Sequence, residues 1–164
     1  MEWIVNSVLD FAKPLQLDVS DVDIRDIVRR AVEFCRIKAD ARSVSLISTL
    51  PSTKITTAID CSHIERALIN LIDNAIEASP RGALVTITVI TARDGIVITI
   101  NDQGAGMNSE ILANLFMPFY TTKADGTGLG MPFAKKVIEA HAGTLTISST
   151  LGVGTEATIR LPCK

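Results

Sequence analysis

Three short motifs, placed between apolar segments, constrain what this 164-residue chain can fold into. They are NLIDNA at 70–75, DQGAG at 102–106 and GTGLG at 126–130. The first presents two amides on one face of a predicted helix, the second places a carboxylate and glycines after a predicted strand, and the third is a glycine loop that leads into a helix. This order is the one that a two-layer nucleotide pocket needs, so the sequence predicts a nucleotide-binding domain.

Composition narrows the class of protein. A chain of 164 residues with 47% hydrophobic and 21% charged residues fits one domain with a substantial core. A net charge of -2 and 4% aromatic residues argue against a nucleic-acid partner. No apolar run reaches the roughly 18 to 20 residues of a membrane span, and no signal pattern opens the chain. We therefore expect a cytoplasmic domain without direct membrane contact. Its cysteines (Cys35, Cys61 and Cys163) lack CxxC spacing and are expected to be free thiols.

Hydrophobic periodicity predicts helices and strands in turn. Helices are predicted after Asp23, after Asp60 or Ser62, after Asn108 or Ser109, and over 131–142. Strands are predicted at 15–19, 44–48, 55–59, 84–91, 96–100, 144–149 and 156–161, with a hairpin at 93–95. The pattern indicates an α+β fold, a two-layer sandwich in which a mixed, mostly antiparallel sheet packs on about three helices. Residues 1–14 have helix-like spacing that Pro14 stops, so we expect a helix tail there and the domain over 15–164.

Two asparagines suggest a metal site. Asn70 and Asn74 are four residues apart, so a helix presents both on one face, and a neutral amide oxygen suits Mg²⁺. We predict Asn74 as the metal ligand. The alternative is a pair that only solvates an exposed helix face, and the downstream glycines weigh against it.

The carboxylate of Asp102 is predicted to read the base. It follows a strand and can accept a hydrogen bond from the exocyclic amine of adenine, where guanine has a carbonyl. Gly104 and Gly106 would permit positive φ and close approach of the backbone to the ligand. Taken alone, the motif is equally compatible with an ordinary strand-to-helix turn.

The glycine loop is predicted to hold phosphate. Gly126, Gly128 and Gly130 precede a helix whose free backbone N–H groups and positive end can receive phosphate oxygens. The spacing matches neither a P-loop nor a dinucleotide fingerprint. Lys123 adds a mobile ammonium that can reach a γ-phosphate, with a solvated loop lysine as the alternative.

Five motifs in order resemble the ATP-binding catalytic domain of two-component sensor histidine kinases of the nitrogen-regulator type. This domain belongs to the superfamily of type II topoisomerase, heat-shock chaperone and mismatch-repair ATPases. The three motifs above, FMPFYTTK at 116–123 and GTEATIRLP at 154–162 resemble the family's N, G1, G2 and F boxes and its closing strand. The resemblance implies a Bergerat-type fold and the cofactors ATP and Mg²⁺.

The resemblance also implies residue roles. Asn74 would bind Mg²⁺, Asn70 would support the phosphates, Asp102 would hold the adenine amine, and residues at about 103–127 would form a lid. The predicted nucleotide-binding residues are Asn70, Asn74, Asp102, Gly104, Gly106, Lys123, Gly126, Thr127, Gly128, Leu129, Gly130 and Thr155. Asn70 and Lys123 are the predicted catalytic residues.

Partners follow from the same resemblance. Residues 1–14 are similar to the end of the second helix of the family's dimerisation hairpin, which implies the histidine-bearing dimerisation domain of the same kinase and a response regulator as partners. His63 and His141 lack the context of a phosphoacceptor and are expected to be structural. Glu77 and Ala142 depart from the family pattern, which places a basic residue and a glycine at these positions.

One position separates kinase from hydrolase. The related ATPases resemble one another in carrying a glutamate where this chain has Asn70, and an amide cannot act as a general base. The sequence therefore favours phosphoryl transfer to a protein side chain. The alternatives are a serine kinase of anti-sigma type and a non-catalytic nucleotide-binding module.

Overall fold

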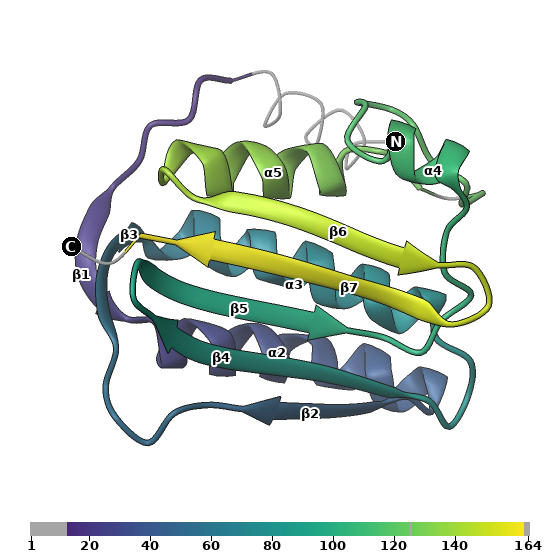
Figure 1. Cartoon of the computed structure of the whole chain (residues 1–164), viewed down its shortest axis with the longest axis horizontal. Coiled ribbons are helices and arrows are strands. Elements are labelled where there is room, and N and C mark those ends of the chain that lie inside the picture. The colour runs from purple at the N-terminus through teal and green to yellow at the C-terminus, as the bar shows by residue number, and fades with distance from the viewer. Residues whose placement is uncertain (1–12, 125, 163–164) are drawn as a thin grey trace.

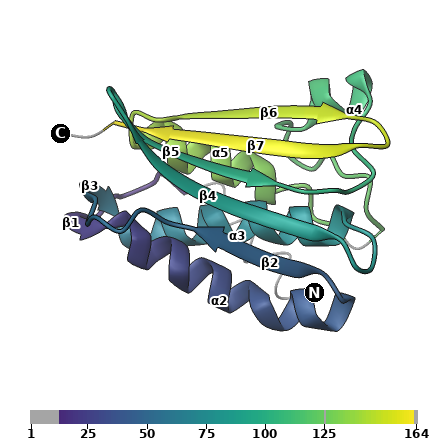
Figure 2. The ribbon, with the colours of Figure 1, turned by 60° about the horizontal axis from the view of Figure 1, so that its bottom comes forward.

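The computed structural model describes residues 13–124 and 126–162, and in this part of the chain three long helices cover one face of a five-stranded sheet. Figure 1 shows α2 (Ile24–Arg42), α3 (Cys61–Ala78) and α5 (Gly130–Ala140) in one layer behind the sheet. Figure 2 shows the same helices on one side of the strands. The predicted two-layer α+β sandwich is therefore confirmed. Apart from Lys13 and Pro14, the predicted helix tail lies outside the described residues, as does Cys163.

The sheet has the strand order β2-β4-β5-β7-β6. Its strands are β2 (Ser45–Thr49), β4 (Leu84–Ala92), β5 (Gly95–Asn101), β7 (Gly154–Leu161) and β6 (Thr144–Thr150). β2 and β4 are parallel because the chain crosses over through α3 between them, and the other pairs are antiparallel. The predicted hairpin is confirmed, since Ala92 pairs with Gly95 across the turn.

Buried apolar and outward-facing polar residues alternate along the strands, so one face of the sheet packs against the helices and the other stays uncovered. In β4, the buried Val85, Ile87 and Val89 face the helices, while the threonines between them face outward. Register places one outward threonine of each of four strands in a row across the open face: Thr88, Thr99, Thr158 and Thr146. β-branched residues suit a pleated surface and their hydroxyls suit water, so the uncovered face needs no further layer.

Polar side chains start the helices where the sequence predicts them. Asp23 accepts a hydrogen bond from the backbone N–H of Arg25 at the start of α2. Asp60, rather than Ser62, accepts from His63 N at 2.9 Å and caps α3. Asn108, rather than Ser109, accepts from Ile111 N at 2.8 Å and caps α4 (Ser109–Asn114). Each bond satisfies an N–H group that the helix leaves without a partner.

One predicted strand is displaced. β1 covers Val19–Asp23 rather than 15–19, and it pairs with β3 (Thr56–Asp60) in a separate two-stranded sheet. The register explains the shift, because Val19 pairs with Asp60, the last residue of β3. Upstream of Val19, β3 offers no further backbone partner, and Asp18 N instead donates to the Asp60 carboxylate at 2.8 Å.

The central helix and the connection after β5 position the candidate site. α3 lies between α2 and α5, and it buries Ile64, Leu68, Ile72 and Ile76 in the core. From the end of β5, the chain leaves the sheet through α4 and returns at α5 (Figure 1). No helix in the described ranges is long and apolar enough to cross a membrane.

Candidate nucleotide-binding site

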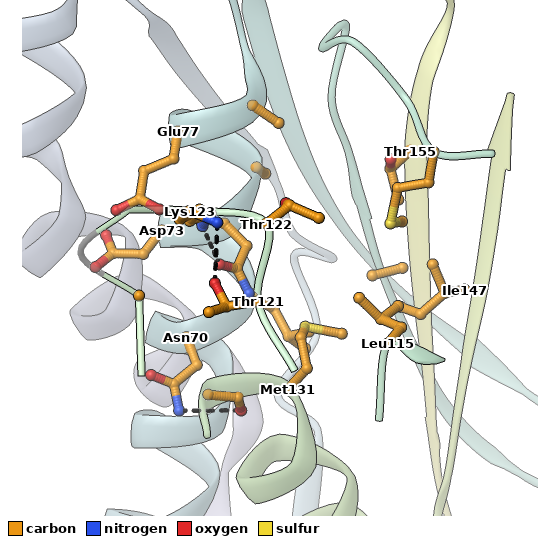
Figure 3. A pocket seen from close by; sticks show the side chains of 18 of the residues that line it. Asn70, Asp73, Glu77, Leu115, Thr121, Thr122, Lys123, Met131, Ile147 and Thr155 are labelled. Carbon is orange, nitrogen blue, oxygen red and sulfur yellow. Dashed lines mark hydrogen bonds and ion pairs between the residues drawn. The ribbon is translucent and has the colours of Figure 1, made fainter. Parts of the chain in front are cut away.

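A cavity of about 610 Å³ opens between α3, the inner face of the sheet and the segment between β5 and α5. Its volume lies in the range of small-molecule sites, roughly 300 to 1,000 Å³. Figure 3 shows Asn70, Asp73 and Glu77 along one helix, and Ile147 and Thr155 on strands at the opposite wall. The cavity therefore lies at the junction of the two layers.

One face of α3 supplies the polar wall. Asn70, Asp73, Asn74 and Glu77 have the spacing i, i+3, i+4 and i+7, and all four line the cavity. The predicted shared face of Asn70 and Asn74 is therefore present. Asn70 makes a long contact of 3.5 Å from its Nδ2 to the carbonyl of Gly130 at the start of α5.

Asp102 is buried at the end of β5 and is held by backbone. Its Oδ1 accepts hydrogen bonds from Gly104 N at 2.8 Å and Thr155 N at 3.1 Å. In the described part of the chain, no group hydrogen-bonds to its Oδ2. Burial raises the pKa of Asp102 above its ordinary value, and the two N–H donors only partly oppose this effect. The aspartate thus keeps one acceptor oxygen for a ligand.

The glycines of the 102–106 motif contact protein rather than open space. A Cβ on Gly104 would lie 2.6 Å from the carbonyl oxygen of Ala78, and Gly104 does not line the cavity. Gly106 lines it at a φ of +66°, and a Cβ there would lie 2.0 Å from Thr150 O. The positive φ considered for both glycines is present at Gly106 but not at Gly104. The close approach is to the end of α3 and to the turn after β6, so these glycines shape the wall that carries Asp102.

A closed loop presents Lys123 to the cavity. Phe119 N donates to the carbonyl of Gly128 at 3.1 Å, which joins the two ends of the loop 119–128. Gly128 has a φ of +67°, and a Cβ there would lie 2.4 Å from the carbonyl carbon of Phe119. Phe119 is itself at a φ of +66°, which is unusual for a bulky residue. The segment predicted to form a lid is therefore joined to the start of α5 by a tight backbone contact.

The start of α5 faces the same cavity. Gly126, Thr127, Gly128 and Gly130 line it, whereas Leu129 is buried in the domain and does not. Leu129 occupies the N-cap position and makes no side-chain cap, so the first N–H groups of α5 have no side-chain acceptor from that position. These groups suit an anion.

A network of charged groups covers the polar wall that α3 supplies. Lys123 Nζ donates to Asn74 Oδ1 at 2.7 Å and forms an ion pair with Glu77 (Figure 3). Lys38, from α2, pairs with Glu77 at 2.5 Å and with Asp73 at 3.2 Å. Burial alone would raise the pKa of Glu77, but the ammonium groups of Lys123 and Lys38 hold that pKa below its ordinary value. Glu77 is therefore an ionised carboxylate on the polar wall of the cavity.

Sequence reasoning missed two parts of the site. Lys38 lies on another helix and carries no motif, and nothing in the sequence links it to α3. The apolar wall, including Ile100, Leu115, Met131, Ile147 and Ala157, was also not predicted. Inward-facing positions of β5, β6 and β7 are a signal that could have found its strand residues.

Both histidines have structural contacts. His141 is buried, accepts from Asp60 N at 2.9 Å through Nε2 and donates through Nδ1 to the carbonyl of Val137 at 2.7 Å. His63 Nδ1 lies 2.8 Å from Asp60 Oδ2. Neither histidine is among the residues that line the cavity.

Comparisons with known proteins place these features in a family context. Residues 59–164 match the family described as histidine kinase-, DNA gyrase B- and HSP90-like ATPase. Sensor histidine kinase ZraS of Klebsiella oxytoca is 32% identical over 160 residues, which cover 97% of this chain and 35% of that protein. The chain spans about a third of the length of the ZraS relatives that it matches.

Solved structures give the same result. Full-length ShkA in complex with AMPPNP is similar with a TM-score of 0.87 and 25% identity, over 98% of this chain and 35% of that chain. The histidine kinase ThkA in complex with the response regulator protein TrrA has a TM-score of 0.84 at 22% identity, over 99% of this chain and 47% of that one. The second likeness supports the fold alone.

Proposed function

We propose, since this chain belongs to the histidine kinase-, DNA gyrase B- and HSP90-like ATPase family, that it is the ATP-binding catalytic domain of a sensor histidine kinase. Its role would be to hold Mg-ATP for transfer of the γ-phosphoryl to a histidine on a dimerisation domain. The observation that carries this proposal is the layout of the cavity, with a buried carboxylate on one wall and amides and an ammonium on the other.

The base end is assigned to Asp102. Its Oδ2 would accept from the exocyclic amine of adenine, and the hydrogen bonds that Gly104 N and Thr155 N donate to Oδ1 support this assignment. Ile100, Ile147 and Ala157 offer apolar contact to a purine ring. Thr155 lies beside Asp102 and is assigned to the same end.

The phosphate end is assigned to α3 and α5. Asn74 fits a cation, since its amide oxygen already holds an ammonium, and it would hold Mg²⁺. The metal would supply positive charge that offsets the charge of the phosphates. Asn70, the loop 126–130 and the start of α5 would orient the phosphate oxygens, and Lys123 would neutralise charge at the γ-phosphoryl group.

Transfer to protein is favoured over hydrolysis. The residue one helical turn before Asn74 is an amide, Asn70, which can orient a phosphate but cannot take a proton from water. Among the cavity-lining carboxylates, Asp73 and Glu77 are occupied by lysines and Asp102 is at the base end. A histidine nitrogen supplied from outside is therefore the proposed nucleophile.

Partners and location complete the proposal. Met117 and Phe119 are exposed on the lid beside the cavity and offer apolar contact to a dimerisation domain. A response regulator is the proposed final acceptor, as the complex of ThkA with TrrA suggests for a protein of the same fold. We place the domain in the cytoplasm, where ATP is available.

The test is phosphoryl transfer with labelled ATP. The domain alone should bind Mg-ATP and acquire no stable label, because its described histidines hold structural contacts. Adding a dimerisation hairpin of the same kinase should produce a label on the hairpin that is stable to base and lost in acid. ATP binding without transfer would favour a regulatory module, and label on serine would favour the anti-sigma type. No binding of ATP would overturn the proposal.

A further inference from the structure

We propose that Glu77 is the second protein ligand, beside Asn74, for the metal that accompanies ATP, and that the Lys123 ammonium occupies the place of this metal in the nucleotide-free protein. The inference rests on the proposed function, which brings Mg-ATP to this cavity. It adds Glu77 as a metal ligand and the replacement of the Lys123 ammonium by the metal, neither of which the sequence motifs indicate.

The position of one nitrogen carries the argument. Lys123 Nζ hydrogen-bonds to Asn74 Oδ1 and pairs with Glu77 Oε2, so a single cation already bridges an amide oxygen and a carboxylate oxygen. The two oxygens come from residues three apart on one face of α3. An ammonium is a compact point charge, and Mg²⁺ prefers the same hard oxygen ligands, one or two from protein and the rest from phosphates and water.

Lys38 keeps Glu77 in place when Lys123 leaves. It binds the other carboxylate oxygen, Oε1, and it is anchored a second time on Asp73. Since the two lysines use different oxygens of Glu77, loss of Lys123 frees Oε2 without releasing the side chain. The metal ligand is therefore preorganised from outside the motif, and Lys38 acts as a positioning residue.

Charge explains why a carboxylate stands at the phosphate end. Glu77 facing a triphosphate without a cation between them would repel it. A divalent cation between Glu77 and the phosphates replaces that repulsion with two attractions. It can displace the ammonium because it carries twice the charge. The hydrogen bond between Phe119 and Gly128, which we call the neck of the loop 119–128, keeps the released Lys123 near the γ-phosphate. The Lys123 ammonium would then pair with this phosphate.

The first experiment measures ATP affinity by calorimetry as a function of Mg²⁺, and repeats it in EDTA. For Glu77→Gln we expect the Mg²⁺ concentration that gives half of the maximal increase in ATP affinity to rise about tenfold or more. In EDTA, the ATP affinity of this variant should equal or exceed that of the wild type. Asp73→Asn is the matched control: it also removes one negative charge from this face of α3 and one ion-pair partner of Lys38, but Asp73 does not contact Lys123. It should keep the wild-type Mg²⁺ dependence.

Two outcomes would overturn the ligand role. Glu77→Gln could show the same Mg²⁺ dependence as the wild type, or Asp73→Asn could show the same shift as Glu77→Gln, which would indicate a general charge effect. Either result leaves the proposed function standing, provided that the wild type binds Mg-ATP. If the wild type binds no ATP, with or without metal, the proposed function itself fails.

The second experiment tests the exchange of cations with Mn²⁺ alone, followed by electron paramagnetic resonance without nucleotide. Lys123→Met removes the competing ammonium and should bind Mn²⁺ more tightly than the wild type. The double variant with Glu77→Gln should lose that gain. Equal Mn²⁺ binding by the wild type and Lys123→Met would contradict the placeholder role, and thermal unfolding confirms that each variant is folded.

Discussion

At the residue scale, the site depends on how single atoms are shared between neighbours. Asp102, which lines the cavity, uses Oδ1 for two backbone donors, and no hydrogen bond engages its Oδ2 in the described part of the chain. Glu77 divides its two oxygens between Lys38 and Lys123. In both cases one oxygen fixes the side chain, and the other is the one that we assign to the proposed ligand. A polar group that is oriented before binding loses less conformational freedom when the ligand arrives.

Asp102→Asn tests this division for the base end. The amide oxygen can keep both backbone bonds, while an NH₂ group replaces Oδ2 and meets the adenine amine as donor against donor. We expect ATP affinity to fall by about 1.5–3 kcal/mol, roughly ten- to a hundredfold, by calorimetry. Unchanged affinity would contradict the assignment of Asp102.

The same variant gives a pH dependence of stability. The pKa of Asp102 is raised in the folded protein, so at pH values between its unfolded and folded pKa the native state binds more protons, and its stability falls as the pH rises. Asp102→Asn removes this cost. The variant should therefore gain free energy of unfolding over the wild type at neutral pH, and the gain should shrink as the pH falls toward 4. A gain that stays constant with pH would argue against the raised pKa.

At the element scale, the segment between β5 and α5 combines a short helix with a loop closed at its base. α4 is capped by Asn108 and has no buried residue, so little holds it to the core. Two contacts attach this segment to α5: the Phe119–Gly128 hydrogen bond, which depends on a left-handed backbone at both residues, and the Lys135 ammonium over the Phe116 ring.

Gly128→Ala tests the neck of the lid. It combines the cost of a positive φ, about 1–2 kcal/mol, with a clash against the backbone of Phe119. We expect lower thermal stability and at least about a tenfold loss of ATP affinity, because the loop that carries Lys123 is displaced. Gly152→Ala is the control, since its φ is +77° but a Cβ there meets nothing within 4 Å. Gly152→Ala should lose stability alone; equal loss of ATP affinity in both variants would contradict the role of the neck.

At the scale of the whole molecule, the cavity lies where the helix layer, the sheet and the segment between β5 and α5 come together. Its walls come from α3, from β5, β6 and β7, and from the lid, which are distant in sequence. A ligand that touches all of them binds only the folded state. Binding and global stability are therefore coupled.

Mg-ATP should accordingly raise the unfolding temperature of the domain. At a concentration a hundred times the dissociation constant, the expected gain in free energy of unfolding is about 2.7 kcal/mol. At the same nucleotide concentration Asp102→Asn should gain much less, and AMP, which lacks the β- and γ-phosphates, should gain less than ATP. Calorimetric melting curves check this, and equal shifts with ATP and AMP would argue against a phosphate site at α3 and α5.

Local patterns of the sequence determined the elements and the order of the motifs. The caps at Asp23, Asp60 and Asn108, the hairpin and the shared face of Asn70 and Asn74 follow from residue spacing, because backbone hydrogen bonding and side-chain direction repeat over a few residues. Asp102 was found for the same reason, as a carboxylate at a strand end followed by glycines.

Only the tertiary structure decided which charges meet. Lys38 and Glu77 are 39 residues apart, and Lys123 and Asn74 are 49 apart, so no local period relates them. The packing of Gly104 on Ala78 and the shift of β1 to its partner β3 have the same origin. Such contacts depend on how layers pack and where a partner strand ends, and these are properties of the assembled core rather than of any one segment.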